Sequence, residues 1–349
     1  MKIKILLMMS LLILLFPTIL FAQNTFKAQV IGKEAQEIKL KGIEGEWQNK
    51  EVIFNDEEHD VISSPEYKIG DKVLVDYSQN FEGEDTFYIV DFVRQKSLYW
   101  LAFLFAFVVI AVGRFKGLRA LVVLGLTFLI ILKFIIPKIL AGSNPLMISI
   151  IGSLFILILS IYITEGLKRN SNIAIFSIFI SLILTGFLSV WFTSIAKLTG
   201  FASDEAIFLV DLAGGNINIK GLLLAGILIG ALGVLDDVVV SQVALVQELK
   251  SSNPDIKKPK LYSKAMNVGV SHLSSMVNTL FLAYAGVALP LLILFSIGEG
   301  SSVSFGHMIN NEIIATEIVR TLTGSIGLVL AVPLATFLAV QFVKNKKVE

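Results

Sequence analysis

Seven runs of apolar residues, each long enough to cross the hydrocarbon core of a bilayer, dominate the chain. They lie at residues 98–113, 119–137, 146–164, 172–192, 221–247, 268–296 and 315–343. A spanning segment must satisfy its backbone polar groups internally, so apolar runs of this length form helices that cross the membrane. The sequence therefore predicts a membrane all-α bundle of about seven transmembrane helices over residues 98–343.

The composition supports a membrane protein and excludes several kinds of chemistry. Hydrophobic residues make up 55% of the chain and charged residues 16%, whereas a soluble domain carries about 25% charged residues. The chain has no cysteine. This excludes a disulfide framework, a thiolate metal site, a cysteine nucleophile and the acylated cysteine of a bacterial lipoprotein.

The first 22 residues have the pattern of a secretory signal peptide. Two lysines within residues 1–4 precede an almost wholly apolar segment at residues 5–21, and Ala22 supplies a small residue for cleavage. An uncleaved first transmembrane helix is the alternative interpretation, because 17 apolar residues is the short limit for spanning. Both interpretations place residue 23 outside the cytoplasm.

Residues 23–97 differ sharply from the rest and predict an extracytoplasmic β domain. This segment holds 16 acidic and 9 basic residues in short alternating stretches. Five such stretches read as strands, and five short strands suit a small barrel of the OB or SH3-like kind. The expected strands lie at residues 26–30, 37–40, 52–54, 73–77 and 86–90.

The acidic surplus of this domain argues against a nucleic-acid partner, since phosphate would be repelled. His59 stands beside Glu57, Glu58 and Asp60, a group that suggests a cation site. We interpret it instead as part of an exposed charged loop. We expect no metal site and no cofactor.

Basic residues orient the spans. With the β domain outside, 13 Lys and Arg residues fall in the inner segments and 4 in the outer loops, as the positive-inside rule requires. The shorter apolar run at 206–213 ends at Gly214, and we interpret it as a re-entrant or interfacial helix. A full span there would place the lysine-rich loop at 248–265 outside. The C-terminal tail, residues 344–349, is then cytoplasmic.

Polar residues distinguish the last three spans from the first four, whose Leu, Ile, Phe and Val content is typical of lipid-facing scaffold. In the span at 221–247, steps of three and four residues bring a group of small and polar residues onto one helix face. Asp237 lies near mid-membrane, where a carboxylate costs about 2.5–3.5 kcal/mol on insertion scales. The members of this stripe are Gly226, Gly230, Gly233, Asp237 and Ser241.

The next two spans offer partners for this carboxylate. Ser275 and Asn278 share a face of the span at 268–296, and Asn278 reaches nearly the depth of Asp237 if the two helices are antiparallel neighbours. His272 is a weak candidate for a proton relay. Glu317 and Arg320, three residues apart, predict an ion pair near the outer interface.

These residues form a hypothetical ion- or solute-binding site: Asp237, Asp236, Ser241, Ser275 and Asn278. The alternative is a structural polar cluster that holds helices together. An intramembrane aspartyl protease is a poor fit, because its two acids lie on separate helices, whereas adjacent residues of one helix diverge by about 100°. With neither a phosphate-binding loop nor a zinc-protease motif, we expect no enzyme activity.

Three blocks of the sequence resemble the YibE/F-like family of bacterial membrane proteins. They are GALGVLDDVVVSQ at 230–242, SMVNTLFLAY at 275–284, and EIVR at 317–320 with GSIGLVLAVP at 324–333. The family pattern has an aspartate at the position of Asp237, whereas the acid at Asp236 departs from it. The resemblance implies a multi-pass bacterial membrane protein and no established substrate.

The sequence thus leads to two functional hypotheses for a protein of the bacterial plasma membrane. In the first, it is a gradient-driven transporter or channel for an ion or small solute. In the second, it is a non-transporting scaffold or sensor whose outer β domain binds a partner or envelope component. The expected partners are the lipid bilayer and either a second copy of the chain or a homologous membrane protein.

Overall fold

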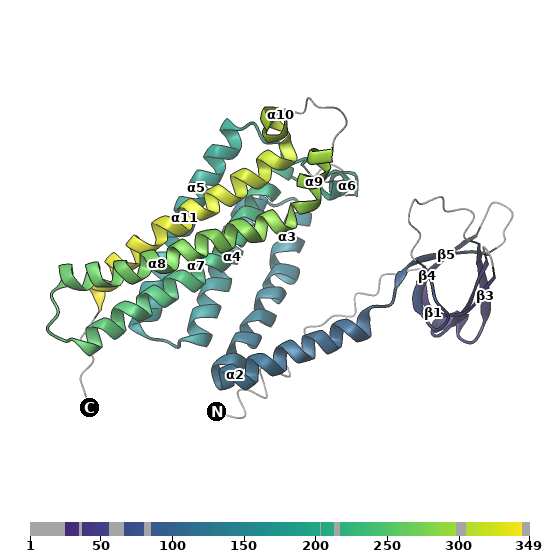
Figure 1. Cartoon of the computed structure of the whole chain (residues 1–349), viewed down its shortest axis with the longest axis horizontal. Helices are drawn as coiled ribbons and strands as arrows, with labels where there is room; N and C mark the ends of the chain where they lie inside the picture. The colour runs from purple at the N-terminus through teal and green to yellow at the C-terminus, as the bar shows by residue number, and fades with distance from the viewer. Residues whose placement is uncertain are drawn as a thin grey trace. The chain divides into compact units, whose positions relative to one another are not determined.

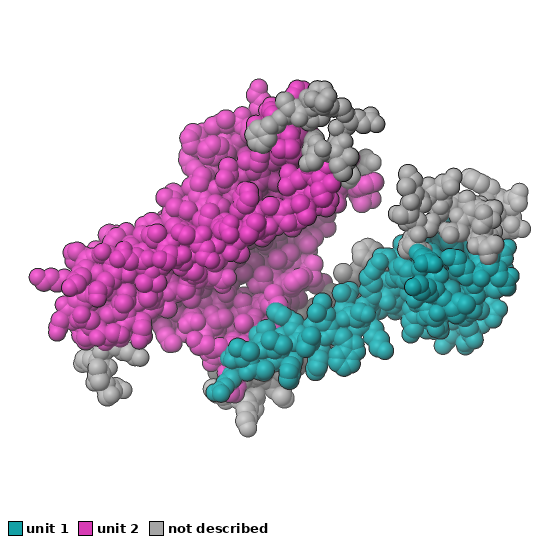
Figure 2. Space-filling view, viewed as in Figure 1, with its two compact units in different colours: residues 1–114 teal, residues 115–349 magenta. Residues whose placement is uncertain are grey.

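The computed structural model describes residues 25–34, 37–55, 66–79, 85–202, 204–212, 217–297 and 305–343. Over these residues the chain is mostly helical, with a small antiparallel sheet towards the N-terminus (Figure 1). It divides into two compact units, Met1–Arg114 and Phe115–Glu349 (Figure 2). The expected signal peptide at 1–22, His59, Gly214 and the tail at 344–349 lie outside the described residues.

The sheet of the first unit contains the five strands that the alternating pattern predicts. They run antiparallel in the order β3-β2-β1-β4-β5, and the edge strands β3 and β5 approach each other, so the sheet is strongly curled (Figure 1). A single 3₁₀ turn, η1 (Gly45–Trp47), follows β2. The strands are β1 (Thr25–Glu34), β2 (Glu37–Gly42), β3 (Glu51–Asn55), β4 (Lys72–Gln79) and β5 (Asp85–Phe92).

Alternate residues of these strands fill the core inside the curl. Ala28, Leu40 and Val73 are completely buried, as the two-residue period of a strand dictates. Trp47 covers one end of the core and stacks on Phe26 with ring centroids 5.5 Å apart. Gly42 permits this cover, because a Cβ atom there would collide with the backbone of Trp47.

The last strand leads directly into the first helix, α2 (Gln95–Ile130). The amide of Val93 donates to the carbonyl of Lys72 at 2.8 Å. Arg94 pairs with Asp91, and the hydrogen bond from Arg94 holds the pKa of this carboxyl below its ordinary value. The helical geometry of α2 is interrupted at Arg114, where φ is 49°.

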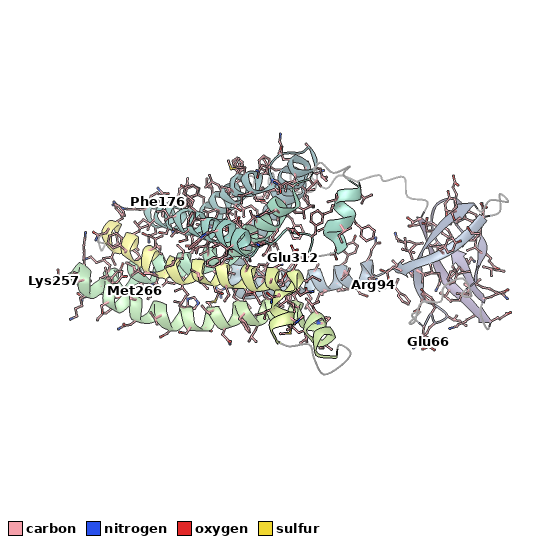
Figure 3. The ribbon with its side chains drawn as sticks, turned by 90° about the horizontal axis from the view of Figure 1, so that it is seen from above. Glu66, Arg94, Phe176, Lys257, Met266 and Glu312 are labelled. Carbon is pink, nitrogen blue, oxygen red and sulfur yellow. The ribbon has the colours of Figure 1, made fainter. Side chains whose placement is uncertain are left out.

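The second unit is a helical bundle. Its longer helices lie side by side, and Figure 3 marks Lys257 and Glu312 near opposite ends of the unit. Lys258, at the start of α8, donates to Gln341, near the end of α11, at 2.8 Å, so these helices are antiparallel. The helical segments after α2 are η3, a π-helix (Ile131–Ile135), α3 (Ile136–Leu140), α4 (Pro145–Thr164), α5 (Arg169–Ile195), α6 (Asp204–Leu212), α7 (Ile219–Ser252), α8 (Lys258–Val287), α9 (Leu289–Ile297), α10 (Phe305–Asn310) and α11 (Glu312–Phe342).

Five helices among the described residues are long and apolar enough to cross a membrane. They are α4, α5, α7, α11 and the continuous stretch Gln95–Leu140. The membrane character of the chain is therefore confirmed. The structure does not reproduce the count of seven: the runs at 98–113 and 119–137 fall within one 46-residue helical stretch, and the run at 268–296 divides between α8 and α9, of which α8 carries many polar residues.

The helix α7 occupies the centre of the bundle and packs against α4, α5, α8 and α11. Leu228, Leu235 and Val239, which are spaced seven and four residues apart along one side of the helix, are almost completely buried. The short helix α6 corresponds to the run predicted at 206–213. It contains nine residues. The helix α9 begins at Leu289, one residue after the C-cap of α8 and just before Pro290.

The prediction that the first four spans are lipid-facing scaffold is wrong for α5. This helix packs against α7 and α11, and a ladder of buried hydroxyls lies on its inner face. Each of four members donates to the backbone carbonyl four residues earlier, which satisfies the hydroxyl locally. These members are Ser177, Ser181, Thr185 and Ser189.

Close contact between α5 and α11 yields a test of the packing. A Cβ atom at Gly327 would collide with the buried hydroxyl of Thr185, whereas one at Gly324 would lie 3.9 Å from Leu280, an ordinary contact. We expect Gly327→Ala to lower the free energy of unfolding by about 1–3 kcal/mol through overpacking. Unfolding in mixed micelles should show no such loss for the matched control Gly324→Ala. Equal effects would contradict this packing.

Candidate functional site

Asp236 lies at the middle of α7, 17 residues after its start at Ile219. Its side chain is half-buried. Ser160 from α4 donates a hydrogen bond to its Oδ2 atom at 2.9 Å. The other oxygen, Oδ1, is buried and has no hydrogen-bond partner among the described residues. One half of the carboxylate is thus fixed, and the other half retains its capacity to accept.

A cavity of about 280 Å³ adjoins this carboxylate. Residues 120–127 of α2, 156–160 of α4 and 229–236 of α7 contribute to its walls. The walls are mostly apolar, with Thr127 and Ser160 as the hydroxyl-bearing members beside Asp236. This combination of an apolar cavity with a few convergent polar groups is the usual composition of a small-ligand site.

Asp237 points to a different face of α7. Its side chain is exposed, and the stripe predicted from the sequence is largely open. Gly226 and Gly233 have no atom within 4 Å of an added Cβ among the described residues. The hydroxyl of Ser241 donates to the backbone carbonyls of Asp237 and Val238, so it satisfies its own helix.

The residue of α8 that lies close enough to act electrostatically on Asp237 is His272. Asn278, predicted to reach the same depth, makes no side-chain hydrogen bond among the described residues. Ser275 and Asn278 are both exposed. The structure therefore places His272 within electrostatic range of Asp237. No side-chain hydrogen bond among the described residues joins Asp237 to Asp236, Ser275 or Asn278.

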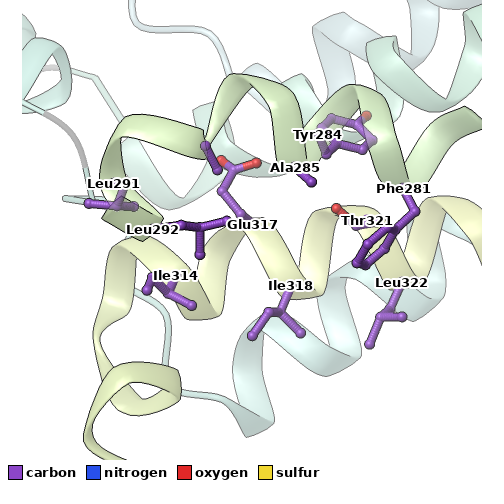
Figure 4. Close-up of a pocket in the computed structure, with 11 residues that line it drawn as sticks. Phe281, Tyr284, Ala285, Leu291, Leu292, Ile314, Glu317, Ile318, Thr321 and Leu322 are labelled. Atoms are coloured by element: carbon purple, nitrogen blue, oxygen red, sulfur yellow. The ribbon is translucent and has the colours of Figure 1, made fainter. Parts of the chain in front are cut away.

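Glu317 and Arg320 form the predicted ion pair, with Oε1 and Nη1 2.8 Å apart. Their side chains are 25% and 30% exposed, so the pair is partly enclosed. A cavity of about 250 Å³ adjoins Glu317. Figure 4 shows that Phe281, Tyr284 and Ala285 of α8 lie on one side of it and that Glu317, Thr321 and Leu322 of α11 lie on the other. Both Glu317 and Arg320 line a second cavity.

The described ranges contain no group of three or more His, Asp or Glu side chains placed to hold a metal ion. The polar groups of the bundle instead act singly or in pairs. The arrangement around Asp236 suits a proton or a single cation, since these need only one carboxylate and a few hydroxyl oxygens.

A family model described as YibE/F-like protein matches residues 101–345. The chain belongs to the YibE/F-like family. The match extends from α2 to the end of α11 and includes both aspartates, so the resemblance predicted from the three sequence blocks is confirmed. No curated protein and no solved structure matches the chain.

Two polar residues of this YibE/F-like bundle escaped the sequence reasoning. Ser160 is one of several hydroxyl-bearing residues in the apolar run at 146–164, and nothing in the sequence marks it as the partner of Asp236. Gln242 is 4% exposed and joins three helices: its Nε2 donates to Ala265 of α8 at 3.1 Å and to Thr336 of α11 at 2.7 Å. An amide within the apolar part of a spanning helix is the signal that could have revealed it.

The contacts of Gln242 give a second test. We expect Gln242→Leu to lower the free energy of unfolding by about 1–3 kcal/mol, because it removes two buried hydrogen bonds between helices. Gln247→Leu is the matched control, since the amide of Gln247 bonds only to Ser251 of the same helix, at 3.2 Å. Unfolding in mixed micelles compares them. A control that loses as much stability would refute the role of Gln242.

Proposed function

We propose that this membrane protein is a gradient-driven transporter or channel for an ion or small solute, with Asp236 as the carboxylate that binds it. One observation carries the proposal: Oδ1 of Asp236 is buried beside a cavity and has no partner among the described residues. Polar groups inside a membrane are costly, so an ionisable one facing a cavity is by default a functional candidate.

The position of Asp236 along α7 suits this role. The helix continues for 17 residues on one side of Asp236 and 16 on the other, or about 25 Å each way at the helical rise. If α7 spans the membrane, the carboxylate lies near its centre. A proton or cation bound there would neutralise the charge, which offsets the cost of placing it in a medium of low dielectric.

Asp237 and His272 supply a second element of the proposal. Asp237 lies on the open face of α7, next to the face that bears Asp236, and His272 of α8 is close enough to act on it electrostatically. We infer that this face is hydrated during transport and that Asp237 and His272 pass protons or cations to Asp236. Two consecutive carboxylates on adjoining faces would then connect the open side of the helix with the enclosed cavity.

The proposed topology has seven crossings, with the β domain outside the bacterial plasma membrane and the C-terminus in the cytoplasm. A 46-residue stretch is about 69 Å long as a continuous helix, roughly twice the hydrocarbon thickness. The break at Arg114 divides it into two segments that can each cross. Together with α8 as a crossing helix, this division gives seven spans and keeps 13 basic residues inside.

The absence of native cysteine allows this topology to be tested with single-cysteine variants. Seven crossings place Ser143 outside and Ser252 inside. We therefore expect a membrane-impermeant maleimide to label Ser143→Cys in intact spheroplasts, and Ser252→Cys only after permeabilisation. Five crossings by the most apolar helices predict the reverse labelling at both positions, so that pattern would overturn the seven-span topology.

Flux measurements test the binding role. In proteoliposomes loaded with a pH-sensitive dye and assayed against a panel of ions, we expect Asp236→Asn to lower flux at least about tenfold, because a charge-assisted interaction worth about 1.5–3 kcal/mol is lost. Elution on size exclusion should stay unchanged. Glu248→Gln, an exposed position of the same helix, is the matched control and should retain full flux.

The companion variant Asp237→Asn separates the two carboxylates. Loss of flux in Asp237→Asn with full flux in Asp236→Asn would move the binding role to Asp237. Wild-type flux in both variants would exclude the aspartates from transport, and absence of flux in the wild type against every ion would favour the second candidate function.

That second candidate is a scaffold or sensor whose β domain binds a partner or envelope component. A groove of about 810 Å³ in the first unit favours it. Lys27 and Lys72 of the sheet contribute to this groove with Lys96, Tyr99 and Trp100 of α2. Lysine and aromatic side chains at the start of a spanning helix are typical of a membrane interface, where such a groove would meet lipid headgroups or an anionic envelope polymer.

A further inference from the structure

A cavity of about 220 Å³ lies where the loop after α5, the first two turns of α7 and the first turns of α11 meet. We call it the Arg320 cavity. Gly200, Leu222, Thr316 and Arg320 are among its lining residues. It is separate from the cavity beside Asp236, and neither the transport proposal nor the scaffold proposal uses it.

The hydroxyl of Thr316 is the first polar group of this cavity that has no hydrogen-bond partner among the described residues. The residue is 4% exposed. Other buried hydroxyls of the bundle, such as those of Thr323 and Thr336 on the same helix, donate to the carbonyl four residues earlier. The hydroxyl of Thr316 does not make this bond. The buried hydroxyls of Ser149, Ser153 and Thr193 also lack a partner among the described residues, but of these four residues only Thr316 lines the Arg320 cavity.

The guanidinium of Arg320 is the second polar group of this cavity with an unused donor. Its Nη1 atom binds Glu317 at 2.8 Å, but its Nε atom is buried and lacks a partner in the part of the chain that the structure describes. An arginine presents five N–H donors in a fixed fork, so one ion pair does not exhaust it. A buried donor without an acceptor costs about 1–3 kcal/mol, which an acceptor in the cavity would recover.

The start of α7 adds a favourable field. The N-terminus of a helix carries a partial positive charge and is a common place for an anion to bind. Asn218 caps this end by accepting from the amide of Gly221 at 2.8 Å. The nearby carboxylate of Glu312 is already held by the amides of Thr199 and Gly200 and by the Thr199 hydroxyl.

We propose that the Arg320 cavity binds a small oxyanion, a carboxylate or a phosphate group, with Nε of Arg320 and Oγ1 of Thr316 donating to its oxygens. Glu317 balances the charge of the guanidinium and holds it through Nη1, which leaves Nε without an acceptor among the described residues. The volume of about 220 Å³ admits a group of a few non-hydrogen atoms, since water occupies about 30 Å³ in the liquid. This inference does not depend on transport.

The test uses the full-length protein in a non-ionic detergent. Sodium acetate, inorganic phosphate and a short-chain phosphatidic acid are added separately at constant ionic strength, with a bulky sulfonate as the balancing anion. A ligand that binds only the folded state raises the midpoint of thermal unfolding with its concentration. We expect at least one of the three probes to do so.

Thr316→Val is the decisive variant, because it keeps the shape of the side chain and removes only the hydroxyl. It should raise the probe concentration needed for half-maximal stabilisation about tenfold, as expected for one lost hydrogen bond to a charged group. Thr321→Val is the matched control. Thr321 is 6% exposed, lies on the same helix and lines the cavity shown in Figure 4 instead of the Arg320 cavity. It should respond like the wild type.

Each outcome decides the proposal. Stabilisation by acetate or phosphate that weakens in Thr316→Val supports a site for free oxyanions, and stabilisation by phosphatidic acid alone supports a lipid headgroup as the source of the same group. If no probe stabilises the wild type, or if Thr316→Val responds as strongly as Thr321→Val, the Arg320 cavity is not an oxyanion site.

Discussion

The rest of the bundle depends on one constraint: a polar group within a membrane-spanning helix must find its partner inside the protein. The hydroxyls of α5 meet this constraint through the carbonyls of their own helix, and Gln242 meets it by joining α7 to α8 and α11. Six buried side-chain atoms of the described bundle lack a partner, and three of them belong to residues that line the cavities described above: Asp236 Oδ1, Thr316 Oγ1 and Arg320 Nε. These three polar atoms, rather than the apolar side chains that line the same cavities, are the candidates for binding an ion or a small ligand.

Glycine residues let neighbouring helices approach closely enough for buried polar side chains to find partners. Gly269 allows the amide of Gln242 to lie against α8, since a Cβ atom there would come within 2.8 Å of Nε2. Gly327 does the same for α5 and α11 at Thr185. Where no neighbour approaches, as at Gly226 and Gly233, the same residue type leaves an open face. A glycine stripe can therefore mark either close helix packing or an open face, and the positions of the neighbouring helices decide which.

Much of the fold could be predicted from local patterns. The two-residue alternation identified all five strands, because each strand buries residues from one of its two faces in the core. Long apolar runs identified the membrane helices. Their number was harder to predict, because the helical stretch Gln95–Leu140 is divided by a kink at Arg114 rather than by a loop. The central role of α5 also escaped prediction, because its buried serines and threonines have little effect on overall hydropathy.

The sequence by itself determined that this is a membrane protein of the YibE/F-like family with a small N-terminal sheet, because length, hydropathy and motif are properties of local segments. It also located two carboxylates at the middle of one helix. Only the tertiary structure decided that Asp236 faces a cavity and a hydroxyl from α4, while Asp237 lies on the open face towards His272. Adjacent helical residues diverge by about 100°, so which of them is enclosed depends on the helices that pack on either side.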